Sequence, residues 1–144
     1  MHQSVIAAIL ALSAAAASAQ MTPVGLWKTI DDDGKTEKSL VRIVDKGGVL
    51  LGTIEKVFEA DKQDARCDKC SDDRKAKPIV GLQIIRGVKQ DTDDKTVWAG
   101  GEVLDPNNGK SYRTRLRVMD GGRKLEMRGY LAFFYRSQTW IRVE

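Results

Sequence analysis

The sequence predicts an all-β protein folded as an up-and-down antiparallel β-barrel of about eight strands. Short apolar or alternating runs are separated by turn-forming residues at fairly regular intervals, as in all-β domains. No segment keeps a helical apolar stripe over three turns, and the polar stretch 59–77 lacks one altogether. Closing such a sheet into a barrel removes the exposed edges of an open sandwich, which is the alternative architecture.

The first 19 residues differ in composition from the rest of the chain. They contain no charged side chain and 8 of the 13 alanines, and Ala17-Ser18-Ala19 supplies the small residues that precede a signal-peptidase cleavage site. The apolar run is shorter than the roughly 20 residues of a transmembrane helix. We therefore predict a signal peptide over residues 1–19 and a mature protein, periplasmic or secreted, without a transmembrane anchor.

The rest of the chain, residues 20–144, is predicted to form a single β-barrel domain. It has no internal repeat and no linker, and it contains no run of five or more like charges, so nucleic acid is not an expected partner. The only histidine, His2, lies in the predicted signal peptide. Catalysis by Ser-His-Asp or Cys-His groups and His-ligated metals are thereby excluded, and we expect no enzyme activity, no metal and no cofactor.

Eight runs along this domain are predicted as strands, each bounded by Gly, Asp, Asn or Pro residues that favour turns. They cover Val24–Thr29, Leu40–Val44, Val49–Val57, Ile79–Lys89, Thr96–Leu104, Ser111–Met119, Lys124–Leu131 and Gln138–Val143. Glycines inside the runs permit the bends and bulges that a small barrel requires. These are Gly52, Gly81, Gly100, Gly101 and Gly129.

Alternation between apolar and charged residues is clearest in the sixth and seventh strands. One face of these strands is apolar and is expected to line the interior; it carries Tyr112, Thr114, Leu116, Val118, Leu125 and Met127. The other face is expected to carry a solvated basic stripe, with anionic lipid headgroups or lipopolysaccharide as a sharper possibility. The stripe consists of Arg113, Arg115, Arg117 and Arg128.

The two ends of the domain suggest how the barrel is closed. The first strand contains Gly25-Leu26-Trp27, and the last contains Trp140 and Arg142. In a closed barrel these strands are neighbours, so the guanidinium of Arg142 can lie over the indole of Trp27 in a cation–π contact. A Gly-x-Trp tripeptide paired with a late arginine resembles the lipocalin and calycin superfamily, whose members are ligand-holding barrels.

Cys67-Asp68-Lys69-Cys70 is the one conspicuous thiol motif. Exported cysteines meet an oxidising compartment, so a local disulfide between Cys67 and Cys70 is expected. So small a loop stabilises the fold by at most roughly 2 kcal/mol. The flanking residues provide no apolar helix to activate a thiol, and only carboxylates are nearby as further metal ligands, which leaves redox and metal-binding roles as the less favoured alternatives.

Several segments together resemble a family of small exported bacterial proteins called domain of unknown function 2147. They are Pro78-Ile79-Val80-Gly81, Trp98-Ala99-Gly100-Gly101, the run from Leu104 to Tyr112, Arg128-Gly129-Tyr130 and Gln138-Thr139-Trp140. The likeness extends in order from Gly25 to Val143. It implies a periplasmic or secreted single domain with a lipocalin-like barrel, and it implies no catalytic role.

Two functions remain open at this point. The first is an exported binding protein that holds a small apolar or amphipathic ligand in the barrel, with aromatic residues at its rim. The predicted ligand-binding residues are Tyr112, Leu116, Val118, Leu125, Met127, Phe133 and Phe134. The second is a cell-envelope protein with a filled core. Its contact surface for an envelope protein or an anionic lipid surface would be the basic stripe or the segment 132–135, which could instead continue a strand into the core.

Overall fold

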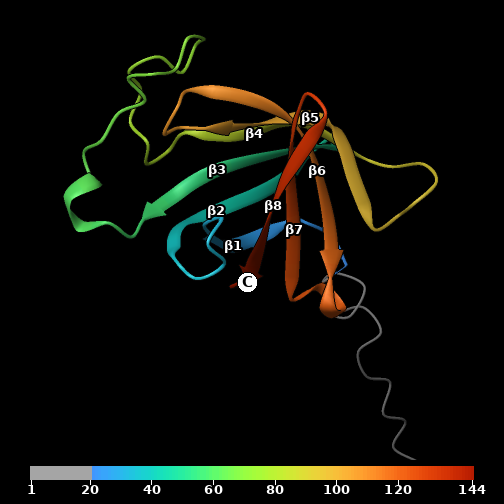
Figure 1. Ribbon diagram of the computed structural model, residues 1–144. Coiled ribbons are helices and arrows are strands. Elements are labelled where there is room, and N and C mark those ends of the chain that lie inside the picture. Colours follow the sequence, from blue (N-terminus) through green and yellow to red (C-terminus); the bar gives the residue numbers. More distant parts are fainter. Residues whose placement is uncertain (1–20) are drawn as a thin grey trace, which may run out of the picture.

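Eight antiparallel strands form a closed barrel in the computed structural model, which describes residues 21–144 (Figure 1). Each strand pairs with the next one in the sequence, and the last strand pairs with the first. The predicted up-and-down barrel is therefore confirmed. The predicted signal peptide, residues 1–19, lies outside the described residues. No helix between residues 21 and 144 is long and apolar enough to cross a bilayer.

All eight predicted strands are present, with the largest differences at the starts of the second, fourth and eighth. The observed strands are β1 (Gly25–Ile30), β2 (Glu37–Lys46), β3 (Val49–Val57), β4 (Gln83–Gln90), β5 (Val97–Asp105), β6 (Lys110–Met119), β7 (Lys124–Leu131) and β8 (Phe134–Arg142). Two short 3-10 turns, η1 (Ala60–Lys62) and η2 (Asp120–Gly122), complete the secondary structure of the described residues.

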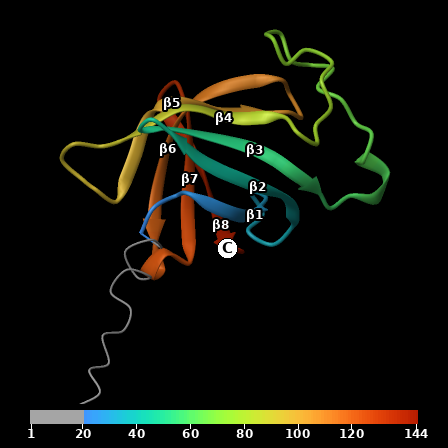
Figure 2. The same ribbon diagram turned by 180° about the vertical axis from the view of Figure 1, so that it is seen from behind.

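The connections alternate between the two ends of the barrel. The β1–β2, β3–β4, β5–β6 and β7–β8 connections meet at one end, which we call the mouth, and the other connections lie at the closed end. Residues 58–82 form the long β3–β4 connection, drawn in green in Figure 1, which extends beyond the barrel wall. The reverse view shows the carboxyl terminus beside β1 (Figure 2).

The fourth strand begins at Gln83, not at Ile79 as the apolar run predicted. Gly81 adopts a φ of +94°, which is not an extended conformation, although its N–H still donates to the carbonyl oxygen of Ile54 in β3 over 2.7 Å. Residue Ile79 belongs instead to the long connection, where its N–H donates to the carbonyl oxygen of Ala65 over 2.9 Å and its side chain packs against the core.

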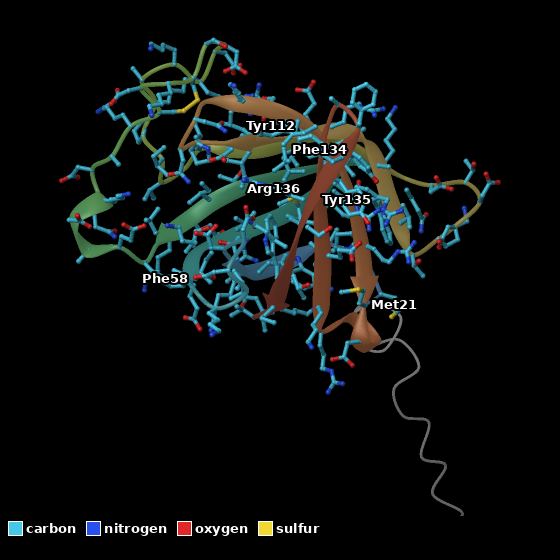
Figure 3. The ribbon with its side chains drawn as sticks, in the orientation of Figure 1. Met21, Phe58, Tyr112, Phe134, Tyr135 and Arg136 are labelled. Carbon is cyan, nitrogen blue, oxygen red and sulfur yellow. A yellow bond between two sulfur atoms is a disulfide. The ribbon has the colours of Figure 1, made fainter. Side chains whose placement is uncertain are left out.

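The eighth strand begins at Phe134, four residues earlier than predicted. Ala132 and Phe133 form a two-residue turn between the paired residues Leu131 and Phe134, and Ala132 has the positive φ of 49° that tight hairpins favour. The aromatic segment thus continues the strand, but it does not fill the core. Phe134 and Tyr135 are 64% and 54% exposed on the hairpin (Figure 3).

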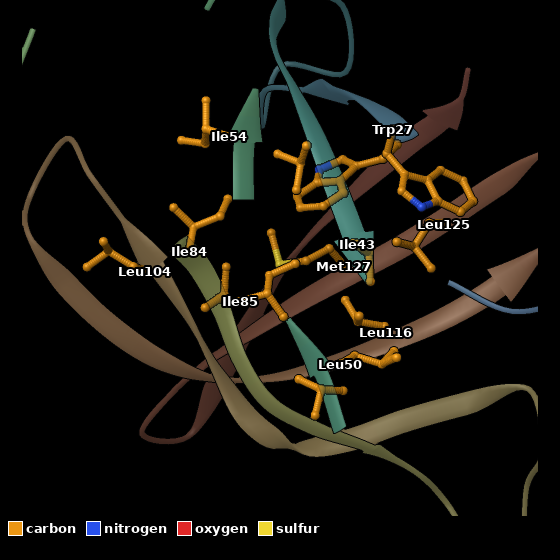
Figure 4. Packing of buried hydrophobic residues seen from close by; sticks show 14 of the residues in the cluster. Trp27, Ile43, Leu50, Ile54, Ile84, Ile85, Leu104, Leu116, Leu125 and Met127 are labelled. Carbon is orange, nitrogen blue, oxygen red and sulfur yellow. The ribbon is translucent and has the colours of Figure 1, made fainter. Parts of the chain in front are cut away.

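Large apolar side chains fill the interior towards the closed end (Figure 4). The predicted alternation in β6 and β7 is confirmed, because their inward-facing residues are buried while their arginines are exposed or half-buried. The most completely buried members of the core include Trp27, Ile43, Leu50, Ile85, Val88, Leu116 and Leu125.

Strands β4 and β5 cross closely at a glycine. A Cβ atom on Gly101 would overlap the carbonyl oxygen of Arg86, so no larger residue fits without displacing the backbone. The pairing of β5 with β6 shifts register between Ala99 and Gly101, and Gly100 between them has a φ of +82°. This bulge is one of the bends that the glycines of the sequence predicted.

The seam between β1 and β8 is the shortest part of the sheet. Only Trp27 with Arg142 and Lys28 with Ile141 are in register across it. The terminal residue extends the seam, since the N–H of Leu26 donates to the carbonyl oxygen of Glu144 over 2.8 Å.

Within residues 21–144, the side chain of Arg142 donates to three carbonyl groups and lies against one indole at this seam. Its Nη2, Nη1 and Nε atoms donate to the carbonyl oxygens of Thr22, Val24 and Gly122 at 2.6, 2.9 and 2.5 Å. Its guanidinium carbon lies 4.3 Å from the centroid of the Trp27 ring. Burial lowers the pKa of Arg142, a sign of a desolvation cost that these contacts offset. The predicted contact at the end of the barrel is present.

Replacing this guanidinium is expected to weaken barrel closure. Arg142→Ala removes three charge-assisted hydrogen bonds and the cation–π contact, so the free energy of unfolding should fall by about 3 kcal/mol. Urea unfolding followed by tryptophan fluorescence measures the change.

Arg123→Ala is the matched control, because Arg123 is exposed on the same end of the barrel and pairs only locally with Asp120. Its loss should cost less than about 1 kcal/mol. Equal effects of the two substitutions would contradict a special role for Arg142.

Candidate ligand cavity

The mouth of the barrel opens into a cavity of about 460 Å³. Three of the four mouth connections, β1–β2, β3–β4 and β5–β6, contribute to its lining, together with inward-facing residues of the strands. This volume lies within the range of roughly 300–1,000 Å³ found for small-molecule sites. The interior of the barrel is therefore filled at one end and hollow at the other.

The floor and lower walls of the cavity are apolar. They are built from core residues of β3, β4, β5, β7 and β8, namely Ile54, Ile84, Val103, Leu104, Met127 and Trp140. Higher on the wall, Tyr112 and Leu131 are only half-buried. Covering this apolar surface with an apolar group releases water and lowers the free energy, which favours binding.

Gly129 leaves space in the middle of this wall. It occupies an inward-facing position of β7, in the series that also contains Leu125 and Met127. A Cβ atom there would meet the Tyr112 Cβ and a Val103 methyl at 3.8 and 3.9 Å, which is ordinary contact distance. A larger side chain at this position would therefore project into the cavity.

The structure brings only two of the seven predicted ligand-binding residues to the cavity wall, Tyr112 and Met127. Leu116, Val118 and Leu125 face the interior, but they lie in the packed core outside the lining of the cavity.

Phe133 and Phe134 do not line the cavity either. The two-residue hairpin turn directs Phe133 into solvent, and Phe134 remains largely exposed. Both residues therefore lie near the rim, but on the outside of the barrel mouth.

A chain of polar contacts rises from the floor to the rim along β8. Trp140 Nε1 donates to Gln138 Oε1, and Gln138 Nε2 donates to Asp32 Oδ1, each over 2.9 Å. The other carboxylate oxygen of Asp32 lies 3.1 Å from Arg136 Nη1. These contacts fix the orientation of the polar side chains on one wall, where they can also bind a polar group of a ligand.

A second polar pair lies on the wall formed by β1 and β2. The hydroxyl groups of Thr29 and Ser39 are 2.7 Å apart, and both residues are buried and line the cavity. Because each hydroxyl can donate and accept, the pair can satisfy itself in the empty cavity and still bind a guest.

The rim carries charges of both signs. Its basic residues are Lys38, Lys62, Arg66, Lys69 and Arg136, and its acidic residues are Asp31, Asp32, Glu59, Asp68 and Asp105. Glu59 lies 2.8 Å from Lys38 and 3.4 Å from Lys62. The Lys38 ammonium lowers the pKa of Glu59, and Glu59 in turn raises the pKa of Lys38, so both groups are charged at neutral pH. The rim is polar without favouring one sign of charge.

The long β3–β4 connection contains a buried disulfide and meets the β5–β6 turn beside the mouth in a close backbone contact. Cys67 and Cys70 form the predicted disulfide and are 0% and 2% exposed. Cys67 Sγ lies 4.0 Å from the carbonyl oxygen of Pro106 in the β5–β6 turn. A Cβ atom on Gly109 would overlap the backbone of Lys69, so the β5–β6 turn can approach the β3–β4 connection this closely only with a glycine at that position. The buried sulfur atoms make the disulfide structural in this conformation.

A buried arginine ties the connection to two strands. Arg74 is 4% exposed and donates to the carbonyl oxygen of Gln83 at 2.9 Å and to the hydroxyl of Ser111 at 3.2 Å. Asp72 binds the same guanidinium, with a shortest distance of 2.6 Å. This ion pair lowers the pKa of Asp72 far below its usual value.

Within residues 21–144, no group of three or more Cys, Asp and Glu side chains is arranged to hold a metal ion. Sequence reasoning missed the charged rim, because its residues come from connections whose positions depend on distant contacts. Gly129, in contrast, was detectable as the small member of an otherwise large apolar series.

Comparisons with known proteins agree with this geometry. A family model described as "Uncharacterized protein conserved in bacteria (DUF2147)" matches residues 25–142. No curated protein matches the sequence. A solved structure of Helicobacter pylori protein HP1028, described as belonging to the lipocalin family, superimposes with a TM-score of 0.70 and 15% sequence identity. The match covers 84% of this chain and 82% of that one and shows the lipocalin-like fold.

Removing the Asp72 carboxylate should loosen the β3–β4 connection. Asp72→Asn leaves the buried Arg74 without its charged acceptor, so the free energy of unfolding at neutral pH should fall by about 1–3 kcal/mol. Asp73→Asn is the control, since the pair of Asp73 with Arg86 is more exposed and solvent screens it, so its loss should change the stability much less.

The effect of Asp72→Asn should depend on pH. The folded state lowers the pKa of Asp72, so its stabilising contribution is complete above the unfolded value of about 3.9 and is lost as the pH falls towards the folded value. Urea unfolding at several pH values should show the variant and the parent protein converging below about pH 4. A constant difference down to acid pH would contradict the assigned ion pair.

Proposed function

The chain belongs to the DUF2147 family of bacterial proteins, and for this member we propose that the barrel binds a small amphipathic molecule. The observation that carries the proposal is the cavity of about 460 Å³, with an apolar floor and a charged rim. The apolar part of the ligand would cover the floor around Trp140 and Met127. Its polar group would remain at the mouth, near Gln138 and Arg136.

The barrel architecture supports this proposal. An eight-stranded barrel is just wide enough either to be filled by its own side chains or to hold one small ligand. This barrel does both, because its closed end is filled and its mouth end is hollow. A purely structural envelope protein is expected to have a completely filled interior, and the cavity at the mouth does not agree with that expectation.

We propose binding without catalysis. A general acid in such a site requires a carboxyl group with a raised pKa. The pKa values of several exposed carboxyl groups are instead lowered, including that of Glu59 at the rim, where Lys38 is the main cause. At the rim, Lys38 forms an ion pair with Glu59, and Arg136 forms one with Asp32.

The proposal includes export from the cytoplasm. It is supported by the composition of residues 1–19 and by the small residues Ala17-Ser18-Ala19. The disulfide between Cys67 and Cys70 is consistent with this location, because disulfides persist in oxidising compartments. Sequencing the amino terminus of the protein recovered from the cell envelope or medium would test for cleavage before Gln20.

Filling the cavity from Gly129 should reduce binding without disturbing the fold. Gly129→Leu places a side chain beside Tyr112 and Val103, so the Kd for the uncharged fluorescent probe N-phenylnaphthylamine should rise at least about tenfold, or roughly 1.4 kcal/mol. Fluorescence titration measures the Kd, and urea unfolding checks that the variant is folded.

The control is Thr139→Leu, which adds an apolar side chain to the outer face of the neighbouring strand. It should leave the Kd unchanged. Unaltered probe binding by a folded Gly129→Leu variant would show that the probe does not enter the cavity and would overturn the proposed function.

A further inference from the structure

Positive charge is concentrated in the last three strands. Residues 110–142 contain nine basic and two acidic residues, a net charge of +7, whereas the other residues contain 15 basic and 18 acidic ones, a net charge of −3. The strands β6, β7 and β8 are consecutive neighbours in the barrel. The excess charge therefore belongs to one continuous part of the wall.

Four arginines on the outer face of β6 and β7 form what we call the arginine stripe: Arg113, Arg115, Arg117 and Arg128. Arg115 and Arg128 stand directly opposite each other and share one carboxylate, Glu126, at 3.5 Å each. Like charges in such positions repel unless an anion lies between them. Arg117 lies 3.9 Å from Asp94, so two carboxylates face the four arginines and leave the stripe with a local excess of positive charge.

The arginine stripe continues into aromatic residues towards the mouth. Tyr130 and Tyr135 pair across β7 and β8, with their ring centroids 6.2 Å apart in an edge-to-face arrangement. The guanidinium carbon of Arg113 lies 5.7 Å from the Tyr130 ring, and that of Arg128 lies 3.9 Å from the Tyr135 ring. Cations and aromatic rings thus share one surface.

At the mouth, this surface ends in a protruding apolar group, the aromatic tip, formed by Phe133, Phe134 and Tyr135. Phe133 is 101% exposed and makes no contact that shields its ring. Leu131 and Arg136 of the same hairpin line the cavity, so the tip stands beside the opening (Figure 3). Clustered exposed aromatic side chains mark an interaction surface.

We propose that the arginine stripe and the aromatic tip dock the barrel on a membrane that contains anionic lipids. Guanidinium groups bind phosphate oxygens in a bidentate manner, and a negative lipid surface attracts each nearby cation. Aromatic side chains favour the interface between headgroups and acyl chains. A convex, fully exposed phenylalanine fits a fluid lipid phase, which closes around it, better than the preformed pocket that a protein partner would need.

Docking in this way would direct the mouth of the cavity towards the bilayer. The tip and the cavity lining share the β7–β8 hairpin, so insertion of Phe133 brings the opening close to the lipid surface. If the proposed function holds, the ligand could exchange with the membrane without crossing water. Docking itself requires only the outer surface and does not rest on an occupied cavity.

Co-sedimentation with lipid vesicles tests the proposal. The protein should bind vesicles of phosphatidylcholine mixed with phosphatidylglycerol and bind pure phosphatidylcholine vesicles much less. Added salt should weaken the binding, because it screens the charges of the stripe. Absence of binding to the mixed vesicles, or equal binding to both kinds, would overturn the proposal.

Two double variants separate the parts of the surface. Arg113→Gln with Arg128→Gln should lower the partition coefficient on mixed vesicles about thirtyfold, or about fivefold for each charge. Phe133→Ser with Phe134→Ser should lower it at least about tenfold. The matched controls are Lys46→Gln with Lys95→Gln at the closed end and Val44→Ser on β2, which should bind as the parent protein does. Equal losses in the controls would overturn the assignment.

A reporter variant tests insertion of the tip directly. Phe133→Trp should show a blue-shifted emission on mixed vesicles, because the three native tryptophans are already buried. Unchanged emission from the bound protein would overturn the proposed orientation.

A cavity variant separates docking from ligand binding. Gly129→Leu should retain vesicle binding even where it abolishes probe binding, so the docking proposal and the proposed function can fail independently. Binding of this face to an envelope protein but not to vesicles would overturn the lipid assignment.

Discussion

The hollow barrel depends on the closure of β1 against β8, where Arg142 supplies contacts that the backbone does not. Only two residue pairs are in register across this seam, so the sheet alone holds it weakly. The guanidinium stacks on Trp27 and binds the carbonyl groups of the segment before β1 and of the β6–β7 turn. An open seam would expose two strand edges and admit water to the core from the side.

Closure at one end allows the other end to remain hollow. Large side chains, among them Trp27, Leu116 and Leu125, are almost completely buried in this packed half. The mouth half then tolerates Gly129 and the half-buried Tyr112, which leave a cavity without dividing the core. The β3–β4 connection adds to the rim, and it is held there by Arg74 and by its close backbone contact with Gly109 of the β5–β6 turn.

Strand alternation made the fold predictable from the sequence, but it did not predict how far from the mouth each inward-facing side chain lies. Tyr112 and Leu116 share an inward face, yet only Tyr112 reaches the cavity, because depth is decided by side chains across the barrel. The start of β8 was missed because Ala132-Phe133 lacks the usual turn residues. Alternation did predict the basic stripe of β6 and β7, because every second residue of a strand faces the same side, but it did not predict that Arg115 and Arg128 stand directly opposite each other.

The polar chain along β8 has a spectroscopic consequence. Of the three tryptophans, Trp140 contributes to the lining of the cavity, while Trp27 and Trp98 do not. Its indole N–H is hydrogen-bonded to Gln138, which a bound molecule could displace or polarise. If the cavity binds the proposed ligand, the emission of this one indole should report its occupancy against the background of the other two.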